Sequence, residues 1–219
     1  MTWRQWLERP EKVWLRQFVF QVHFWLGAAV AAYVLVMSVS GSVIVFRNDL
    51  PPSRAVEWLV RLHESWLAGD AGHVVNAVGA ATLLGLALTG AVIWWPGLAY
   101  WRRSLTIEWR ARVPRLNWDA HSALGAWFLP FVAMWGLSGL YLARPELFDV
   151  LLRLDPADRV VDGGLFWLTA LHFGRFNRAT ELVWAVAGLV PAALAFTGVF
   201  ICCRRMIFSL PSNPKHAAG

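Results

Sequence analysis

Two histidines in this sequence begin the same pattern of residues, and each stands at the start of a long apolar run. An ionisable side chain is costly inside a membrane, so each is a functional candidate, and their repetition indicates that they share one ligand. In both copies seventeen residues separate the histidine from a Ser-Gly pair. The two copies are His23-x-x-Leu26-Gly27 with Ser40-Gly41, and His121-x-x-Leu124-Gly125 with Ser138-Gly139.

A second pair of histidines follows at matching places. Leu62-His63 and Leu171-His172 are each followed, sixteen residues after the histidine, by a glycine. The segments beyond then end in related ways, as Thr89-Gly90-x-x-x-Trp94-Trp95 and as Thr197-Gly198-x-x-x-Cys202-Cys203. Four of the six histidines therefore form two symmetric pairs.

Paired neutral imidazoles indicate haem chemistry, because two of them on opposite sides of the iron give an electron-transfer haem. We expect two b-type haems, with His23 and His121 binding the inner one and His63 and His172 the outer one. His73 begins the second apolar run and is an alternative outer ligand if the preceding loop folds differently. For each histidine alone, a hydrogen bond between helices is the competing interpretation. No Cys-x-x-Cys-His occurs, which excludes covalent c-type haem.

Glycines accompany both inner histidines on the same helical face, as expected where a flat macrocycle needs slim helices. Gly41 and Gly139 lie eighteen residues beyond their histidines, which is about 27 Å along a helix and level with the outer pair. Gly27 and Gly125 lie one helical turn beyond His23 and His121. Gly90 and Gly198 are candidates for the same role at the inner haem. Close helix packing is the alternative explanation for all six.

Haem propionates would need cations near the membrane faces. Arg47 and Arg144 end the first and third apolar runs at nearly matching distances from His23 and His121. We expect them to serve the propionates, although charge topology or snorkelling explains any single arginine equally well.

The elements that must carry these residues are membrane helices. Hydrophobic residues make up 58% of 219 and charged residues 16%, a composition rare in soluble domains. Four stretches are long enough to cross a hydrocarbon core of about 30 Å. We place these spans near 18–46, 74–95, 121–143 and 181–203.

The repeated spacings predict an all-α membrane protein, a four-helix bundle built from two parallel two-helix repeats. Residues 1–219 form one membrane domain, and short amphipathic helices are expected in the outer loops, at 55–68 and 164–174. The parts are repeat 1 at 18–95, a cytoplasmic loop at 96–120, repeat 2 at 121–203 and a cytoplasmic tail at 204–219.

The distribution of charge predicts the orientation. The two ends and the middle loop carry twelve Lys and Arg against four acidic residues, so both termini should be cytoplasmic. The net charge of +6 is mostly this topology signal rather than a nucleic-acid surface. The first apolar run is too long for a secretory signal and should remain as an anchor.

Taken together, the His-x-x-Leu-Gly…Ser-Gly helices, the Leu-His segments and the Thr89–Pro96 ending resemble the PepSY-associated transmembrane helix family. That family includes haem-containing ferric-siderophore reductases of the bacterial inner membrane. The resemblance implies an inner-membrane oxidoreductase that passes electrons from a cytoplasmic or quinone-side donor to ferric iron, a ferric siderophore or a periplasmic redox partner. It places the four paired histidines on the family's histidine positions.

One departure from many relatives is plain, because only about 27 residues join the first two spans and leave no room for a large periplasmic PepSY module. A Gly-x-Gly-x-x-Gly nucleotide motif is also absent. Two other functions compete with electron transfer. A non-catalytic anchor or assembly subunit of a larger respiratory or transport complex would need no cofactor. A proton or metal transporter is disfavoured because no Asp or Glu lies well inside a span.

Overall fold

The computed structural model describes residues 3–153 and 163–209, and within them every regular element is a helix. The all-α prediction is therefore confirmed for the described residues. The α-helices, in chain order, are α1 (Trp3–Glu8), α2 (Trp14–Ile44), α3 (Arg54–Ser65), α4 (Asp70–Trp94), α5 (Val113–Trp127), α6 (Leu129–Ala143), α7 (Pro145–Leu152), α8 (Gly163–Phe173), α9 (Arg178–Gly188) and α10 (Val190–Ser209). Two 3₁₀ turns are η1 (Pro10–Lys12) and η2 (Arg103–Leu105).

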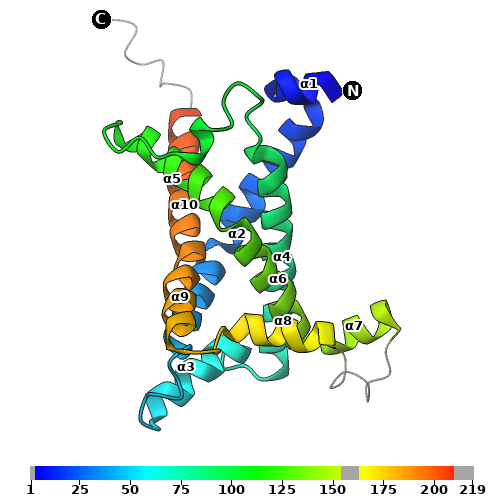
Figure 1. The fold of residues 1–219 in the computed structure, drawn as a ribbon, viewed down its shortest axis with the longest axis vertical. Helices are drawn as coiled ribbons and strands as arrows, with labels where there is room; N and C mark the ends of the chain where they lie inside the picture. The colour runs from blue at the N-terminus through cyan, green and yellow to red at the C-terminus, as the bar shows by residue number, and fades with distance from the viewer. Residues whose placement is uncertain (1–2, 154–162, 210–219) are drawn as a thin grey trace, which may run out of the picture.

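Three apolar helical segments are long enough to span a bilayer, namely α2, α4 and α9 with α10, and α5 with α6 makes a fourth if that bent pair is one span. The chain is thus a multi-pass membrane protein. The long helices run between two ends (Figure 1). One end carries α1 and η2 and is called the α1 end. The other carries α3, α7 and α8 and is called the α3 end.

The span expected near 121–143 is not one straight helix. Helices α5 and α6 meet at Phe128 and are bent by 65°. Pro130 follows the bend in the first turn of α6. Its ring clashes with the carbonyl of Ala126 in a straight helix, and it has no N–H to bond that carbonyl. A new helix, α6, therefore begins after the bend, inside a stretch that the sequence pattern treated as one segment.

The fourth span also has a break, between Gly188 and Val190. Here a side chain of another helix enters the hydrogen-bond ladder. Ala192 N donates to Ser38 Oγ at 3.0 Å, and Ser38 Oγ donates to Gly188 O. The hydroxyl thus joins a donor and an acceptor that would bond each other directly in an unbroken helix. The backbone carbonyl and N–H left unpaired at the break next to Pro191 thus find their hydrogen-bond partner on α2.

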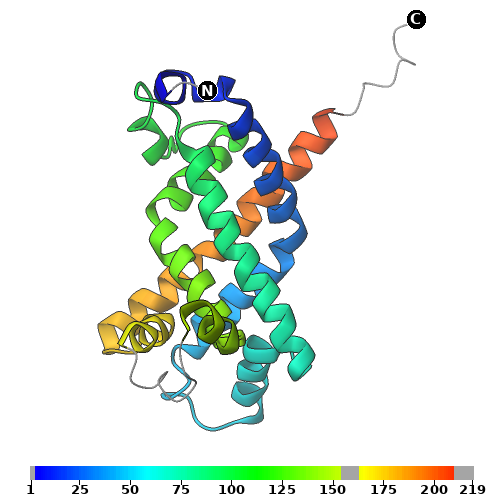
Figure 2. The ribbon, with the colours of Figure 1, turned by 90° about the vertical axis from the view of Figure 1, so that its right-hand side faces the viewer.

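Packing pairs α4 with α6 and α10 with α2, and α2 also contacts α4 (Figures 1 and 2). Small residues permit the close approaches. A Cβ on Gly136 of α6 would lie 2.8 Å from Leu84 N on α4, and one on Gly188 would lie 2.6 Å from Ser42 Oγ on α2. The helices meet nearly backbone to backbone, as membrane helices do.

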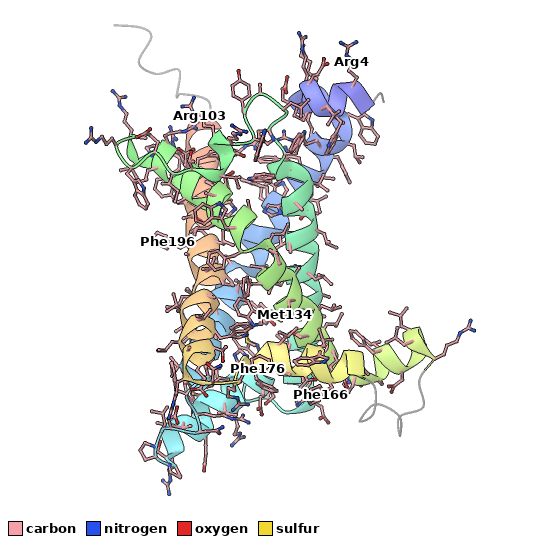
Figure 3. The ribbon with its side chains drawn as sticks, viewed as in Figure 1. Arg4, Arg103, Met134, Phe166, Phe176 and Phe196 are labelled. Atoms are coloured by element: carbon pink, nitrogen blue, oxygen red, sulfur yellow. The ribbon has the colours of Figure 1, made fainter. Side chains whose placement is uncertain are left out.

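Short helices lie where the two amphipathic segments were expected, since α3 falls within 55–68 to one residue and α8 covers most of 164–174. Helix α7 was not predicted, and it extends sideways from the bundle (Figure 1). Figure 3 shows Arg4 and Arg103 at the α1 end, Phe166 and Phe176 at the α3 end, and Phe196 on the outer surface between them. Phe196 is 71% exposed, as expected of a side chain that faces lipid.

Candidate functional site

Two cavities lie inside the bundle, and each is lined by one of the histidine pairs. The cavity nearer the α1 end has a volume of about 380 Å³ and contains His23 and His121. The cavity nearer the α3 end has a volume of about 310 Å³ and contains His63 and His172. Both are mainly apolar and fall in the size range of small-molecule sites. We call them the His23–His121 cavity and the His63–His172 cavity.

The His23–His121 cavity takes its histidines from two long helices, α2 and α5, and their ring centroids lie 6.5 Å apart. Nδ1 of His23 is 2.9 Å from Thr89 Oγ1 of α4. Nδ1 of His121 is 2.8 Å from Thr197 Oγ1 of α10. A metal–imidazole bond is about 2 Å long, so two such bonds and two ring radii would separate the centroids by roughly 6 Å. The observed spacing matches that of two ligands of one metal ion.

The His63–His172 cavity takes its histidines from the short helices α3 and α8. Nδ1 of His63 lies 2.9 Å from Ser40 Oγ on α2, and Nδ1 of His172 lies 2.7 Å from Ser138 Oγ on α6. Burial lowers the pKa of His63 to about 4. Burial, and to a smaller degree the nearby His63, lowers the pKa of His172 to about 3. Both imidazoles are therefore neutral at pH 7, the form that binds a metal.

The hydroxyl partners determine which nitrogen of each ring carries the proton. Each hydroxyl has one proton and lies 2.7 Å from the carbonyl oxygen four residues earlier, to which it donates. It must then accept a hydrogen bond from Nδ1–H of the histidine. In all four rings Nε2 is left with its lone pair free. A partner on the second nitrogen that fixes the tautomer is typical of metal-binding histidines.

A glycine follows each of these hydroxyl residues and faces the same imidazole. A Cβ on Gly41 would lie 3.0 Å from His63 Cε1, and a Cβ on Gly90 would lie 3.3 Å from His23 Cε1. A Cβ on Gly198 would lie 3.3 Å from His121 Cε1, and one on Gly139 would make only an ordinary contact with His172, at 3.9 Å. Three of the four glycines thus make room for an imidazole ring. Gly27 and Gly125 line the His23–His121 cavity without such a contact, since the atoms nearest to their added Cβ are leucine methyls at 3.8 Å.

Helix α3 is fixed from α4 by Asn76, which is buried. Its Nδ2 donates to the carbonyls of His63 and Glu64, both at 2.8 Å. Its Oδ1 accepts from Trp66 Nε1 at 2.8 Å. These bonds satisfy carbonyls at the end of α3, where a helix has no partners of its own. For α8 the corresponding contact is the bond from Trp184 Nε1 to Leu171 O at 2.7 Å.

Of the two arginines expected to serve propionates, only Arg47 lines a cavity. It lines the His63–His172 cavity with Arg175 and lies 3.7 Å from Glu64. Burial, with the nearby Arg47 charge, lowers the pKa of Arg175. Arg144 instead pairs with Glu146 at 3.2 Å and lines neither cavity.

His73 also lines the His63–His172 cavity, from the first turn of α4. In contrast to His63, it makes no side-chain hydrogen bond with the described residues that would set its tautomer. Both histidines therefore line this cavity, and of the two only His63 has a hydroxyl contact at Nδ1.

The sequence interpretation did not assign a role to the four hydroxyls or to Asn76. A signal for the hydroxyls was present, because each comes directly before one of the four glycines, as Ser40-Gly41, Thr89-Gly90, Ser138-Gly139 and Thr197-Gly198. Nothing comparable marks Asn76, whose three partners lie ten to thirteen residues before it in a separate helix.

Comparison with known proteins gives a family and one relative. The PepSY-associated TM region matches residues 48–158. An uncharacterized protein of Pseudomonas aeruginosa is 30% identical over 101 residues, which are 45% of this chain and 24% of that protein. The chain therefore matches about a quarter of the length of this relative. No solved structure matches the chain.

Proposed function

Because the chain belongs to the PepSY-associated TM region family, and its two cavities each present a pair of histidines, we propose that it transfers electrons across the membrane through two b-type haems. His23 and His121 would bind one haem. His63 and His172 would bind the other.

The observation that carries the proposal is the hydroxyl contact at Nδ1 of all four rings, from which the protonation pattern is inferred. Every Nδ1–H is bound by a hydroxyl that has already given its own proton to a backbone carbonyl, so every Nε2 is available as a ligand. Interhelical hydrogen bonding alone would not require the same nitrogen to be free in all four. Two of these free nitrogens belong to each cavity.

The number of donors also fits haem better than a bare metal ion. No group of three or more His, Cys, Asp or Glu that could hold a metal ion occurs among residues 3–153 and 163–209, whereas structural zinc uses four protein ligands and catalytic zinc three. A porphyrin brings four equatorial nitrogens and needs only two axial imidazoles. When bound, such a haem supplies one-electron redox chemistry, while the protein fixes the ligands and keeps the site apolar.

The relation between the two halves is part of the proposal. We take 18–95 and 121–203 as parallel repeats related by a pseudo-twofold axis along the membrane normal. The matched hydroxyl–histidine contacts support this, since His23 with Thr89 in one half corresponds to His121 with Thr197 in the other. The bend at Phe128 has no counterpart of similar size in α2.

The position in the cell is also part of the proposal, and the charge distribution and the family support it. The chain would lie in the bacterial inner membrane with both termini in the cytoplasm, so that the His63–His172 cavity faces the periplasm. Electrons would enter from a cytoplasmic or quinone-side donor. They would leave to ferric iron, a ferric siderophore or a periplasmic redox protein, which makes a ferric-chelate reductase the activity to test.

The test is a redox difference spectrum of the protein purified after haem-replete expression. We expect two b-type components and about two haems per chain. His121→Ala should remove one component and leave the other, and His172→Ala should do the reverse. A protein free of haem under these conditions would contradict the proposal and favour an anchor subunit, and loss of both components in each variant would contradict the pairing.

A further inference from the structure

Two of the residues that line the His23–His121 cavity each carry a buried N–H donor that has no acceptor among the described residues. They are Nε of Arg16, from the first turn of α2, and Nε1 of Trp94, from the last turn of α4. Both side chains line the cavity. Nε1 of the adjacent Trp95 is buried and unpartnered too, but Trp95 is not a lining residue.

The position of the Arg16 side chain is fixed by another of its nitrogens. Nη2 donates to Ile93 O at 2.6 Å, one of the carbonyls left unpaired at the end of α4. This bond holds the guanidinium against the end of α4 and leaves Nε turned away from backbone acceptors. No ion pair found between described residues includes Arg16.

A buried donor without an acceptor is costly, and the cost is greater for a charged group. Most residues that line the cavity with these donors have apolar side chains that offer no acceptor, among them Phe20, Phe24 and Pro96. A ligand in the cavity is therefore the available source of an acceptor. The positive charge of Arg16 favours an anionic one, and guanidinium N–H groups match carboxylate geometry.

We propose that Arg16 and Trp94 bind the carboxylate side chains of the macrocycle held by His23 and His121. This inference rests on the proposed function. The two N–H groups then fix how the macrocycle is turned about its iron–histidine axis, because its acidic edge must face the α1 end. Arg16 and Trp94 are positioning residues, and the chemistry at the iron does not involve them.

The other cavity differs in this respect. Its Arg47 already lies near the carboxylate of Glu64, at 3.7 Å. Its second arginine, Arg175, lies with its guanidinium carbon 4.8 Å from the Phe173 ring centroid. Among the described residues that line either cavity, buried donors without an acceptor thus occur only on Arg16 and Trp94. A requirement for carboxylates on the macrocycle should be stronger there.

The experiment compares binding of haemin with binding of its dimethyl ester, in which both carboxylates are blocked. The full-length protein with both His63→Ala and His172→Ala, produced without haem, is titrated with each compound and followed by absorbance, so that only the His23–His121 cavity keeps two of the four paired histidines. We expect haemin to bind at least about tenfold more tightly than the ester.

Two variants in the same background locate the effect. Arg16→Met removes the charged donor, and Trp94→Phe removes one N–H while keeping an aromatic ring. Each should weaken haemin binding several-fold and leave ester binding unchanged. Arg103→Met, at the same end of the molecule, and Trp25→Phe, on the exposed side of α2, are the matched controls and should keep the full preference for haemin.

Equal binding of haemin and ester by the unmodified background protein would overturn the inference while leaving the proposed function intact. A preference for haemin that survives in both variants would place the carboxylates elsewhere and overturn it as well. A phospholipid that copurifies with the protein and is lost in Arg16→Met, with no change in haemin preference, would assign the donors to a lipid phosphate instead. Absence of any bis-histidine spectrum with either compound would contradict the proposed function itself.

Discussion

The two histidine pairs are held by the same local contacts but by differently built supports. In the His23–His121 cavity the histidines and their hydroxyl partners all belong to long helices, which are α2, α4, α5 and α10. In the His63–His172 cavity only the hydroxyl partners, Ser40 and Ser138, belong to membrane-spanning segments. The histidines there belong to α3 and α8, which have 12 and 11 residues.

A short helix has little stability of its own and depends on tertiary contacts. Helix α3 depends on Asn76, and α8 on Trp184. The comparison therefore predicts that the His63–His172 cavity opens by local changes, whereas the His23–His121 cavity changes only when the bundle does. An electron carrier would benefit from a rigid site at one end and an adaptable site at the end that meets its partner.

The largest effect is expected from Asn76→Ala. Loss of this amide leaves two helix-end carbonyls and the Trp66 N–H without partners, which should lower the free energy of local unfolding of α3 by about 3 kcal/mol. Hydrogen exchange of the α3 amides measures it, and haem content should fall at the His63–His172 cavity alone. Asn117→Ala is the control, because Asn117 makes one bond, to Thr197 O at 3.0 Å. Equal loss of haem from both cavities would contradict the comparison.

A substitution at the helix break between the two cavities should affect the structure around both cavities. Pro191, next to the break that Ser38 satisfies, lines both cavities, as do Val34 and Leu83. Ser38→Ala leaves Gly188 O and Ala192 N unpaired and should cost about 2 kcal/mol of global stability, measured by thermal unfolding. Ser42→Ala should cost less than about 0.5 kcal/mol, because Ser42 only donates to Ser38 O within the same helix. A similar cost for both serines would show that the inserted hydroxyl is not needed.

Glycine substitutions test rigidity directly. Gly90→Ala puts a methyl group 3.3 Å from His23 Cε1, with both residues on long helices that cannot shift, and should cost about 1–2 kcal/mol in haem affinity. Gly41→Ala approaches His63 more closely, at 3.0 Å, yet should cost less because α3 can move. Gly27→Ala, with ordinary contacts, is the control. Haem titration of the three variants gives the order, and a larger cost for Gly41→Ala than for Gly90→Ala would refute the difference in rigidity.

Much of this arrangement could be predicted from the sequence, and the failures have physical reasons. Apolar length located the three long spans and the bent α5–α6 pair, with ends that differ by up to eight residues, because hydrophobic thickness sets the length of a span. The bend at Phe128 was missed although Pro130 is visible in the sequence. Proline in a membrane helix is often tolerated, so composition alone does not say whether the helix continues.

At the site, regular spacing indicated which histidines belong together, and the structure brings each expected pair to one cavity. The tautomers could not be predicted, because they depend on which hydroxyl of another helix faces each ring. Arg144 was paired with Arg47 on sequence distance alone. After the bend in its span, Arg144 lies beside Glu146, two residues away, and this local acidic residue is a nearer partner than the cavity.

The smallest effect is expected from removing the hydroxyl partners of the histidines. This change distinguishes a histidine held by a long helix from one held by a short helix. Thr197→Val removes the acceptor of His121 Nδ1–H but keeps the shape of the side chain, and α5 still holds the ring in place. The ring becomes a weaker base when this bond is lost, so the ferric haem is stabilised less and the midpoint potential should rise, by the equivalent of about 1 kcal/mol, with haem retained. Thr197→Ser keeps the hydroxyl and should leave the potential unchanged.

Ser138→Ala removes the corresponding acceptor of His172, whose helix α8 receives a hydrogen bond from Trp184 at Leu171 O. Here the ring can turn as well as lose basicity, so haem affinity should fall together with the change in potential. Potentiometric titration with haem quantification distinguishes the two responses. If Thr197→Val also lost haem while Ser138→Ala kept it, the long helices would not be the more rigid support, and the hydroxyl bonds rather than the helices would be what holds the imidazoles in the His23–His121 cavity.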